Sequence, residues 1–543
     1  MTNSIKGQLI DIHQNRIFPA KIEIANGRIA AIYETEGNYE HYIAPGLVDA
    51  HVHIESSMLT PVEFARLAVS HGTVATVSDP HEIANVLGAK GIRYMIENAK
   101  ASPLKFHFGA PSCVPATTFE TAGATIDSKE ILEILQWPEI TYLAEMMNFP
   151  GVLYKDPEVM KKIKAALDMG LPVDGHAPGL RGDDAKKYIE SGISTDHECT
   201  TYEEALEKIQ YGMKIAIREG SAAKNFEALI PLIADYPESI MFCSDDKHPD
   251  ELIISHIDEL IRRGLKKGYP LFDLLRAASL NPKEHYNLNI GMLKVGDPAD
   301  FITIDHPDSF QVRECWISGK KVAENGVSFL ESIPFEKINY FNVSRKKSAD
   351  FELPAKGSRA RVIEAIDGAL ITESFEVDIQ EKGGKIQADT EKDILFISVV
   401  NRYSDAPVAN ALIHGFGIKG GAIASTVAHD CHNIIAVGTS TESISKVVNE
   451  LIRTKGGICA MNESGAIKIL PLPIAGLLAA ESAEKVAEAY QKIDQMVKTE
   501  LGSTLNAPFM TLSFMALLVI PSLKLSDKGL FDGNQFEFTD LFK

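Results

Sequence analysis

The sequence predicts an α/β protein centred on a TIM-type (β/α)8 barrel, and three observations predict it. Between Leu47 and Asp246, short apolar runs rich in β-branched residues alternate with amphipathic stretches of helical period, as in repeated βα units. Eight such runs can be counted, which is the number of strands in this barrel. Nearly every run ends in a residue that can bind a metal or transfer a proton, and such barrels place their chemistry at these ends.

The expected elements follow one another along the chain. The predicted strands are residues 47–53, 73–79, 105–110, 140–146, 171–176, 193–197, 213–218 and 239–245. Helical periodicity predicts helices at residues 61–70, 91–100, 128–136, 157–169 and 223–234. Each strand but the last is thus followed by a segment long enough to return the chain to the start of the next strand.

Metal-binding residue types gather at the predicted strand ends. These ends carry His51, His53, Asp79, Glu145, His176, His197, Arg218 and Asp245. Because side chains alternate along a strand, His51 and His53 leave the same face and can hold one cation. The chain has 16 histidines, and four of them fall at these ends. A single such histidine is more often a core residue, but the coincidence across five strands indicates a metal site.

The segments that flank the barrel are expected to form one discontinuous β-sandwich. Alternating runs at residues 8–12, 16–24 and 28–32 predict small antiparallel strands, and a similar pattern returns at 299–304 and 314–317. The predicted domains are residues 1–45 plus 291–335 for the sandwich, 46–290 for the metal-binding barrel, and 336–543 for an additional α+β C-terminal domain.

Composition disfavours several classes of function. A net charge of −20 without a basic stripe disfavours nucleic acid as a partner. The six cysteines lie far apart with no C-x-x-C pair, which indicates reduced thiols and suits the cytoplasm. The N-terminus lacks a signal-peptide pattern and the apolar stretch 514–520 is too short to span a bilayer, so no membrane association is expected.

These residues resemble the amidohydrolase superfamily, and more closely its adenine deaminase family. The superfamily features are the His51-x-His53 strand, His176, His197, Asp245, residues 278–282 (ASLNP) and residues 291–300 (GMLKVGDPAD). The narrower resemblance lies in residues 53–58 (HIESSM), 79–83 (DPHEI), 144–151 (AEMMNFPG), 174–178 (DGHAP) and 244–246 (SDD). Residues 429–433 (HDCHN) and 514–517 (FMAL) look like that family's extra domain.

The resemblance implies a binuclear metal centre. Many superfamily members bridge two metals through a carboxylated lysine at the fourth strand, whereas this strand end carries Glu145. A glutamate can bridge two cations directly, so we expect Glu145 between one metal on His51, His53 and Asp245 and another on His176 and His197. Nitrogen and oxygen ligands suit Mn, Fe or Zn. The resemblance favours manganese, with iron or zinc as alternatives.

The expected reaction is hydrolytic deamination of adenine to hypoxanthine and ammonia, in purine salvage. A hydroxide that bridges the two cations would attack C6, and Asp245 would carry its proton to the leaving amine. Glu82 is the expected partner of ring N1, and its alternative role is a carboxylate that stabilises a helix N-terminus. Arg218, Glu219, Ser221 and His81 are candidate substrate contacts. A salt-bridged barrel rim explains the first three nearly as well, and His81 and Asp79 could instead support the metal ligands.

The C-terminal region carries two further signals. Residues 415–420 (GFGIKG) match the dinucleotide-binding pattern, but no clear helix follows, so we interpret them as a turn between strands and expect no cofactor site. His429 and His432 could line the barrel mouth or bind a further ion, and a polar structural cluster is the favoured interpretation.

Rival functions stay open at the level of sequence. Another reaction on the same centre, such as cyclic amide hydrolysis or N-acyl sugar deacetylation, is compatible with the spacing. A scaffold that has lost catalysis should have lost ligands, and here every proposed ligand is present. The cytidine deaminase type requires a P-C-x-x-C motif, which the chain lacks. The resemblance also implies a homo-oligomer, with a dimer expected.

Overall fold

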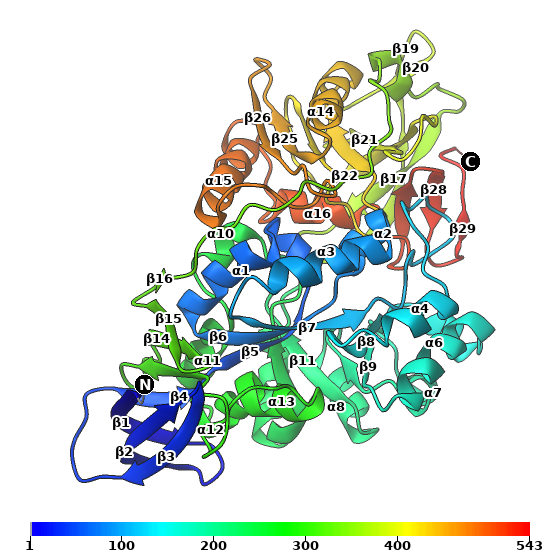
Figure 1. The fold of residues 1–543 in the computed structure, drawn as a ribbon. Coiled ribbons are helices and arrows are strands. Elements are labelled where there is room, and N and C mark those ends of the chain that lie inside the picture. The colour runs from blue at the N-terminus through cyan, green and yellow to red at the C-terminus, as the bar shows by residue number, and fades with distance from the viewer. Residues whose placement is uncertain (1–2, 543) are drawn as a thin grey trace.

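Eight parallel strands form the barrel in this computed structural model, which describes residues 3–542 (Figure 1). They are β5 (Leu47–Val52), β6 (Thr73–Ser78), β7 (Lys105–Ala110), β8 (Ile140–Met146), β9 (Val173–Gly175), β10 (Thr195–Asp196), β11 (Lys214–Arg218) and β12 (Ile240–Cys243). Strands β5 to β9 pair in order in one parallel sheet, and β10 to β12 pair in a second. The predicted barrel is confirmed.

Two seams join these sheets into a closed barrel. Between β9 and β10, the amide of Ser194 donates to the carbonyl of Val173 over 2.9 Å. Between β12 and β5, the amide of Asp245 donates to the carbonyl of His51 over 2.9 Å, and the amide of His53 donates to the carbonyl of Asp245 over 3.2 Å. The second seam therefore runs through three predicted metal ligands, so closing the barrel also fixes their positions.

Several strands end slightly earlier than predicted. His53, Asp79, His176, His197 and Asp245 lie one or two residues beyond the last residue of their strands. The backbone leaves the ladder at these points, and Asp245 has a φ of 54°, in the left-handed region. The side chains are therefore presented by the first residues of the loops at the carboxyl rim of the barrel.

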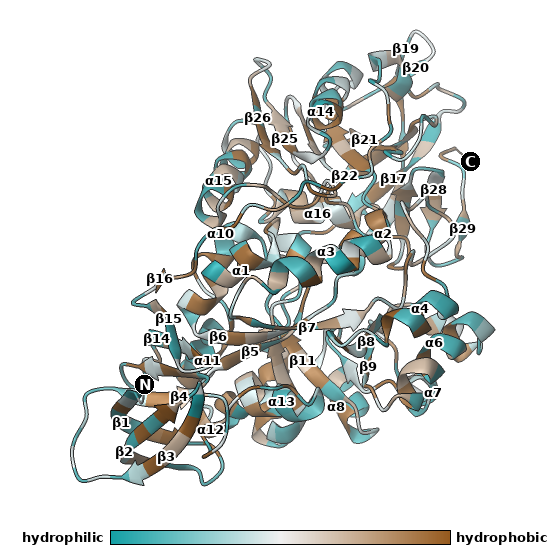
Figure 2. Cartoon of the chain, viewed as in Figure 1, coloured by the Kyte–Doolittle hydropathy of each residue, from teal (hydrophilic) through white to brown (hydrophobic). Residues whose placement is uncertain are grey.

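Helices surround the barrel, where Figure 2 shows hydrophobic residues along β5 and β11 and hydrophilic residues on outer helices such as α8. They are α1 (Pro61–Ala68), α2 (His81–Leu87), α3 (Ala89–Ala99), α4 (Ser128–Ile134), α5 (Phe149–Leu153), α6 (Pro157–Asp168), α7 (Gly182–Glu190), α8 (Tyr202–Gln210), α9 (Phe226–Leu229), α10 (Pro249–Leu252), α11 (Ile257–Lys266), α12 (Leu271–Leu275) and α13 (Asn281–His285). The expected helix at 223–234 is wrong in part, because α9 gives way to a 3₁₀ helix at Ile230–Ala234. Pro231 explains the change, since it has no amide to continue α-helical bonding.

Strands from both flanks of the barrel join one eight-stranded sheet. They are β1 (Asn3–Asp11), β2 (Arg16–Ala25), β3 (Arg28–Glu34), β4 (Tyr42–Pro45), β13 (Phe301–Ile304), β14 (Val312–Ile317), β15 (Lys320–Glu324) and β16 (Val327–Ser328), in the order β16-β15-β14-β13-β4-β1-β2-β3. The antiparallel pairing of β4 with β13 joins the two flanks. Asn26 and Gly27 both have positive φ, as a tight hairpin turn requires. The division into domains at residues 45, 290 and 335 stays a prediction.

A second eight-stranded sheet forms the C-terminal region, which lies above the barrel in Figure 1. Its strands are β17 (Arg359–Ala365), β18 (Thr372–Asp378), β21 (Leu395–Val400), β22 (Ala409–His414), β23 (Ala422–Ser425), β24 (Ile434–Gly438), β25 (Gly457–Met461) and β26 (Ile467–Pro471). Helices α14 (Thr441–Thr454) and α15 (Ala483–Thr499) accompany this sheet, and α16 (Pro508–Phe514) lies between it and the barrel (Figure 1). Short strands complete the region: β19 (Gln380–Lys382), β20 (Lys385–Gln387), β27 (Leu523–Ser526), β28 (Gly529–Asp532) and β29 (Glu537–Phe538).

Hydrogen bonds to backbone carbonyls of the barrel loops fasten this region to the carboxyl rim of the barrel. The amide of Ala479 donates to the carbonyl of Met58 over 2.8 Å. The side-chain amide of Asn433 donates to the carbonyl of Thr121 over 2.9 Å. The C-terminal region therefore closes over the end of the barrel at which the predicted ligands lie.

Residues 415–420 form a turn between β22 and β23, where the amides of Gly415 and Gly417 donate to Asp393.

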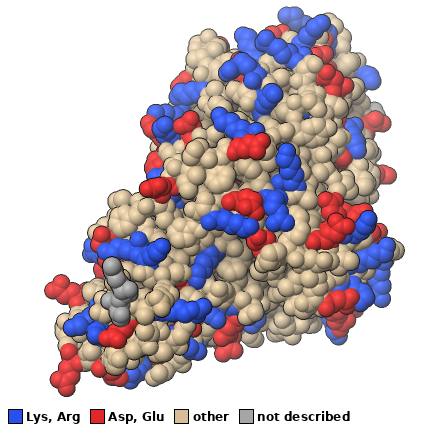
Figure 3. Space-filling view, in the orientation of Figure 1, with Lys and Arg blue, Asp and Glu red and all other residues tan. Residues whose placement is uncertain are grey.

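The surface and the helices give two further observations. On the face drawn in Figure 3, acidic and basic side chains are interspersed rather than gathered by sign. Among residues 3–542, no helix combines the length and the apolar composition needed to cross a membrane.

Candidate active site

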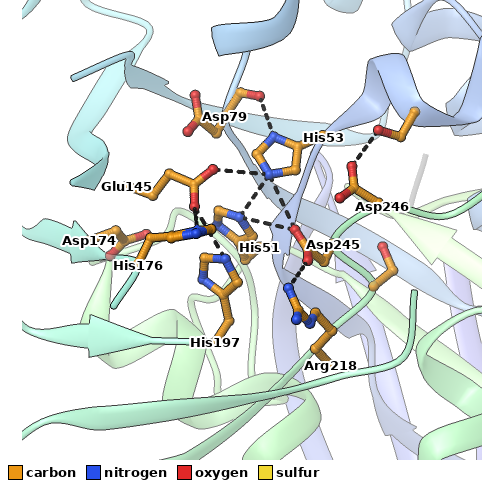
Figure 4. A network of polar contacts seen from close by, with 12 residues as sticks. His51, His53, Asp79, Glu145, Asp174, His176, His197, Arg218, Asp245 and Asp246 are labelled. Carbon is orange, nitrogen blue, oxygen red and sulfur yellow. Dashed lines mark hydrogen bonds and ion pairs between the residues drawn. The ribbon is translucent and has the colours of Figure 1, made fainter. Parts of the chain in front are cut away.

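The six predicted metal ligands converge inside the carboxyl end of the barrel (Figure 4). They are His51, His53, Glu145, His176, His197 and Asp245, and each is at most 7% exposed. Each comes from the end of a different strand, except that His51 and His53 share β5 and the turn after it. The alternation of side chains along β5 aims both imidazoles at the barrel axis, as predicted.

Glu145 lies between two groups of these ligands. Its Oε1 is 3.2 Å from His53 Nε2, and its Oε2 is 2.6 Å from His176 Nδ1 and 3.2 Å from His197 Nε2. Asp245 Oδ1 lies 3.2 Å from His53 Nε2 and 3.5 Å from His51 Nε2. One carboxylate therefore faces both halves of the cluster, which is the placement that a bridging ligand needs.

The donor set fits two divalent cations. His53 donates from Nδ1 to the carbonyl of Asp79 over 3.2 Å, so its Nε2 keeps a lone pair toward the centre of the cluster. The same Nε2 lies 3.1 Å from Nε2 of His51, which is a suitable separation for two ligands of one ion. Imidazole nitrogens and carboxylate oxygens without thiolate suit Mn, Fe or Zn.

Arg218 lies behind the ligands rather than in the cavity in front of them. Its guanidinium is 2.6 Å from Asp245 Oδ2 and also forms an ion pair with Glu198. Burial opposes ionisation of Asp245, but Arg218 and His197 outweigh it and hold the pKa of this carboxyl well below its usual range. Arg218 therefore keeps Asp245 charged and holds its Oδ1 toward the histidines.

Glu219 and Ser221 are also held by partners outside the cavity. Glu219 forms an ion pair with Arg263 over 2.5 Å. Ser221 donates to Glu251 over 3.1 Å and accepts from the amide of His248 over 2.8 Å. Of the four residues predicted to contact the substrate, His81 is the one that lines the cavity, and the structure places Arg218, Glu219 and Ser221 in the rim that supports it.

A cavity opens in front of the ligands, between the barrel and the C-terminal region. The barrel contributes His81, Glu82, Met147, Glu198 and Asp246 besides the predicted ligands, and the C-terminal region contributes Leu370, His429, Asp430, Phe514 and Leu517. The rings of Phe514 and His429 stack with their centroids 4.6 Å apart. The cavity thus has an apolar, partly aromatic wall opposite a polar one.

Glu82 lies in the first turn of α2 and faces the two histidines of the C-terminal motif. Its Oε1 pairs with Nδ1 of His429, and its Oε2 lies against Nε2 of His432. Burial opposes ionisation, but His429, His432 and His81 together hold the pKa of Glu82 well below its usual range. His429 therefore lines the barrel mouth, and His432 lies behind Glu82.

Comparison with known proteins identifies the family. The amidohydrolase family model matches residues 42–322, and the model for the adenine deaminase C-terminal domain matches residues 369–537. An adenine deaminase from Sulfurovum sp. is 56% identical over 99% of this chain and 99% of its own length. The chain belongs to the adenine deaminase family. A second member, from Salinibacter ruber, is 52% identical over 99% of both chains. Among solved structures, a β-aspartyl dipeptidase from Fervidobacterium islandicum is similar, with 17% identity and a TM-score of 0.47 over 62% of this chain and 100% of that one.

Several residues of this candidate active site were not predicted from the sequence. Glu198 lies 3.6 Å from both His176 Nδ1 and His197 Nε2, and its position directly after a predicted ligand was the available signal. Asp430 lies in the motif 429–433, beside a histidine that was singled out. Leu370 and Phe514 line the cavity from segments far along the chain, and nothing in the local sequence indicates that placement.

Proposed function

We propose that this chain converts adenine and water to hypoxanthine and ammonia. The observation that carries the proposal is the 56% identity, over 99% of both chains, to a relative named adenine deaminase. The buried cluster of histidines and carboxylates supports a metal-dependent hydrolase reaction on a C–N bond. The assignment of adenine among possible substrates follows from the family.

The same proposal assigns the ligands. His51, His53 and Asp245 would hold one divalent cation and His176 and His197 a second, with Glu145 between them, and manganese is the ion we favour over iron or zinc. When bound, two such cations make a water molecule nucleophilic at neutral pH. Unlike a carboxylated lysine, Glu145 requires no bound carbon dioxide to serve both halves of the cluster.

Two carboxylates would move the protons. As C6 of adenine becomes tetrahedral, ring N1 gains a proton, and the amine must gain one before it leaves. Asp245 presents Oδ1 to the ligand histidines while Arg218 holds Oδ2, so Oδ1 is the oxygen that would take a proton from water and deliver it to the amine. Glu82 lines the cavity and would carry to N1 the proton that water releases when it ionises, with His429 and His432 against its two oxygens.

The walls of the cavity suit a planar heterocycle. Met147, Leu370, Phe514 and Leu517 offer apolar surface for the faces of a purine. Asp246 and His429 offer polar atoms for its edge nitrogens, and the ring of His81 borders the same cavity. We retain His81 as a candidate substrate contact and assign Arg218, Glu219 and Ser221 to support of the rim.

We further propose a cytoplasmic, homodimeric enzyme of purine salvage. All six cysteines are buried and free, which suits a reducing compartment. Size-exclusion chromatography with light scattering would measure the dimer.

The test is ammonia release by manganese-loaded protein from a panel of candidate substrates. The panel contains adenine, adenosine, guanine, cytosine, dihydroorotate and an N-acyl amino sugar, and hydrolysis of the last two is followed by loss of substrate. We expect turnover of adenine far above that of the others. Turnover of a cyclic amide without turnover of adenine would contradict the substrate assignment. No turnover of any compound would favour a non-catalytic scaffold protein.

A further inference from the structure

A second cluster of ligand-type side chains lies beside the predicted metal pair. It contains His81 and Glu82 from the start of α2 and Asp430 from the loop after β23, and we name these three residues the acceptor cluster. Each of the three is at most 3% exposed. Their nearest ligand atoms all lie within 4.8 Å of one another, which is the spacing of atoms that share one ion.

The hydrogen bonds of His81 leave one nitrogen facing only acceptors. Its Nδ1 donates to Asp79 Oδ2 over 3.1 Å, which places a ring proton on that side. Its Nε2 lies 3.4 Å from Glu82 Oε1 and 3.7 Å from Asp430 Oδ1 and has no hydrogen-bond partner in the described structure. A carboxylate that orients an imidazole so that its other nitrogen faces further ligands is the usual environment of a metal-bound histidine.

The two carboxylates of the acceptor cluster have no basic partner besides imidazoles. Among residues 3–542, neither Glu82 nor Asp430 forms an ion pair with a lysine or an arginine. The imidazoles beside them are those of His81, His429 and His432. The amide of Ala428 donates to Nδ1 of His432, so this ring faces Glu82 as a neutral donor. Two buried carboxylates with so few cationic partners favour a bound cation between them.

We propose that His81 Nε2 and the carboxylates of Glu82 and Asp430 bind a third divalent cation, distinct from the predicted pair. One imidazole nitrogen and two carboxylates suit Mn, Fe or Zn, the same class of ion as the pair. The ring of His81 separates the two sites, because its Nδ1 edge faces Asp79 and Glu145 and its Nε2 edge faces the acceptor cluster.

This cation joins two parts of the fold. His81 and Glu82 belong to the barrel, whereas Asp430 belongs to the C-terminal region that covers the barrel mouth. A shared ion therefore holds the covering region against the rim beside the cavity. Glu82 Oε2 stays on His432, while Oε1 faces His81 and would reach the ion.

Metal content of the full-length protein tests the proposal. After loading with manganese and removal of free metal, we expect about three manganese per chain in the wild type and about two in Asp430→Asn, measured by plasma mass spectrometry. Glu120→Gln is the matched control. Its carboxyl is buried close to Asp430, and burial together with Asp430 raises its pKa to about 8, so the glutamine resembles the protonated form; we expect it to keep three.

A second measurement locates the ion without a variant. In a crystal of the manganese-loaded wild type, anomalous scattering should place a third peak within coordination distance of His81 Nε2 and Asp430. Two manganese per chain in the wild type, with two anomalous peaks, would overturn the proposal and leave a protonated His81 as the cation of the cluster. Three in both the wild type and Asp430→Asn would overturn the assignment of Asp430.

Discussion

Arg218 Nη1 lies 2.6 Å from Asp245 Oδ2, on the side of the carboxylate that faces away from the ligand histidines. The guanidinium is buried and also forms an ion pair with Glu198, so it is held in one position. The oxygen that it leaves free is the one that faces His51 and His53. Arg218 thereby leaves Oδ1 of Asp245 free to face these histidines, which is the oxygen that our proposal assigns to metal binding and proton transfer.

Replacement of this arginine should weaken the site without removing a ligand. We expect Arg218→Met to lower metal affinity or kcat/KM by about 10-fold to 100-fold, the range found for residues that support metal ligands. Arg181→Gln, which removes an exposed ion pair with Glu207, is the control and should behave as the wild type. Manganese titration and adenine kinetics measure the effect, and unchanged values in Arg218→Met would contradict the supporting role.

Glu145→Gln should reduce bound manganese and abolish turnover. A neutral amide cannot supply the charge that two cations share, although its size is unchanged. Metal analysis of the purified variant checks this, with Glu139→Gln as control because Glu139 precedes the same strand and pairs with Lys100 at the surface. Full metal occupancy with normal activity in Glu145→Gln would refute the bridge.

Lys524 should hold two residues of the apolar cavity wall in position. It is fully buried, and its Nζ donates to the carbonyls of Leu370 and Phe514, over 2.7 and 3.0 Å. Lys524→Met leaves both carbonyls unpaired, at a cost of about 1–3 kcal/mol each. Because both residues line the cavity, we expect KM for adenine to rise more than kcat falls.

The control for this variant is Lys528→Met. Lys528 also donates to two carbonyls, those of Thr118 and Glu120, but neither residue lines the cavity. It should lower the Tm without a change in KM. An equal KM in the wild type and Lys524→Met would show that Lys524 contributes to stability alone.

The stability of the protein should depend on pH through Glu120. Burial, with Asp430 second, raises the pKa of this carboxyl from 4.5 to about 8. The folded state therefore keeps a proton that the unfolded chain has lost, so the stability from this group is full below pH 4.5 and is lost as the pH rises to about 8. The Tm of the wild type should fall over this window more than the Tm of Glu120→Gln. Parallel Tm curves would rule out this titration.

The barrel, and the convergence of six candidate ligands at its rim, could be predicted because the relevant information is local. Apolar runs mark the strands, and the polar residue that ends each run, such as His176 or Asp245, lies at the carboxyl rim whatever the exact strand boundary. Boundaries were less certain, because the strands leave the ladder one or two residues early. The helical periodicity of residues 223–234 runs past Pro231, where the α-helix ends.

The remainder of the site depends on contacts between distant segments. Leu370 and Phe514 reach the cavity because the C-terminal sheet packs above the rim, and no pattern around either residue encodes that docking. The same holds for Asp430, whose approach to His81 joins positions separated by more than three hundred residues. A position at a strand end makes Arg218 equally compatible with a substrate contact and a salt-bridged rim, and its ion pairs with Glu198 and Asp245 favour the rim.

The pairing of β4 with β13 has a consequence for synthesis of the chain on the ribosome. The first four strands emerge early, but the edge that β13 occupies stays open until the whole barrel sequence has been translated. The walls of the cavity emerge later still, because Phe514 lies near the end of the chain. The histidines and carboxylates of the barrel rim that line the cavity are therefore all synthesised before the C-terminal segments that cover them.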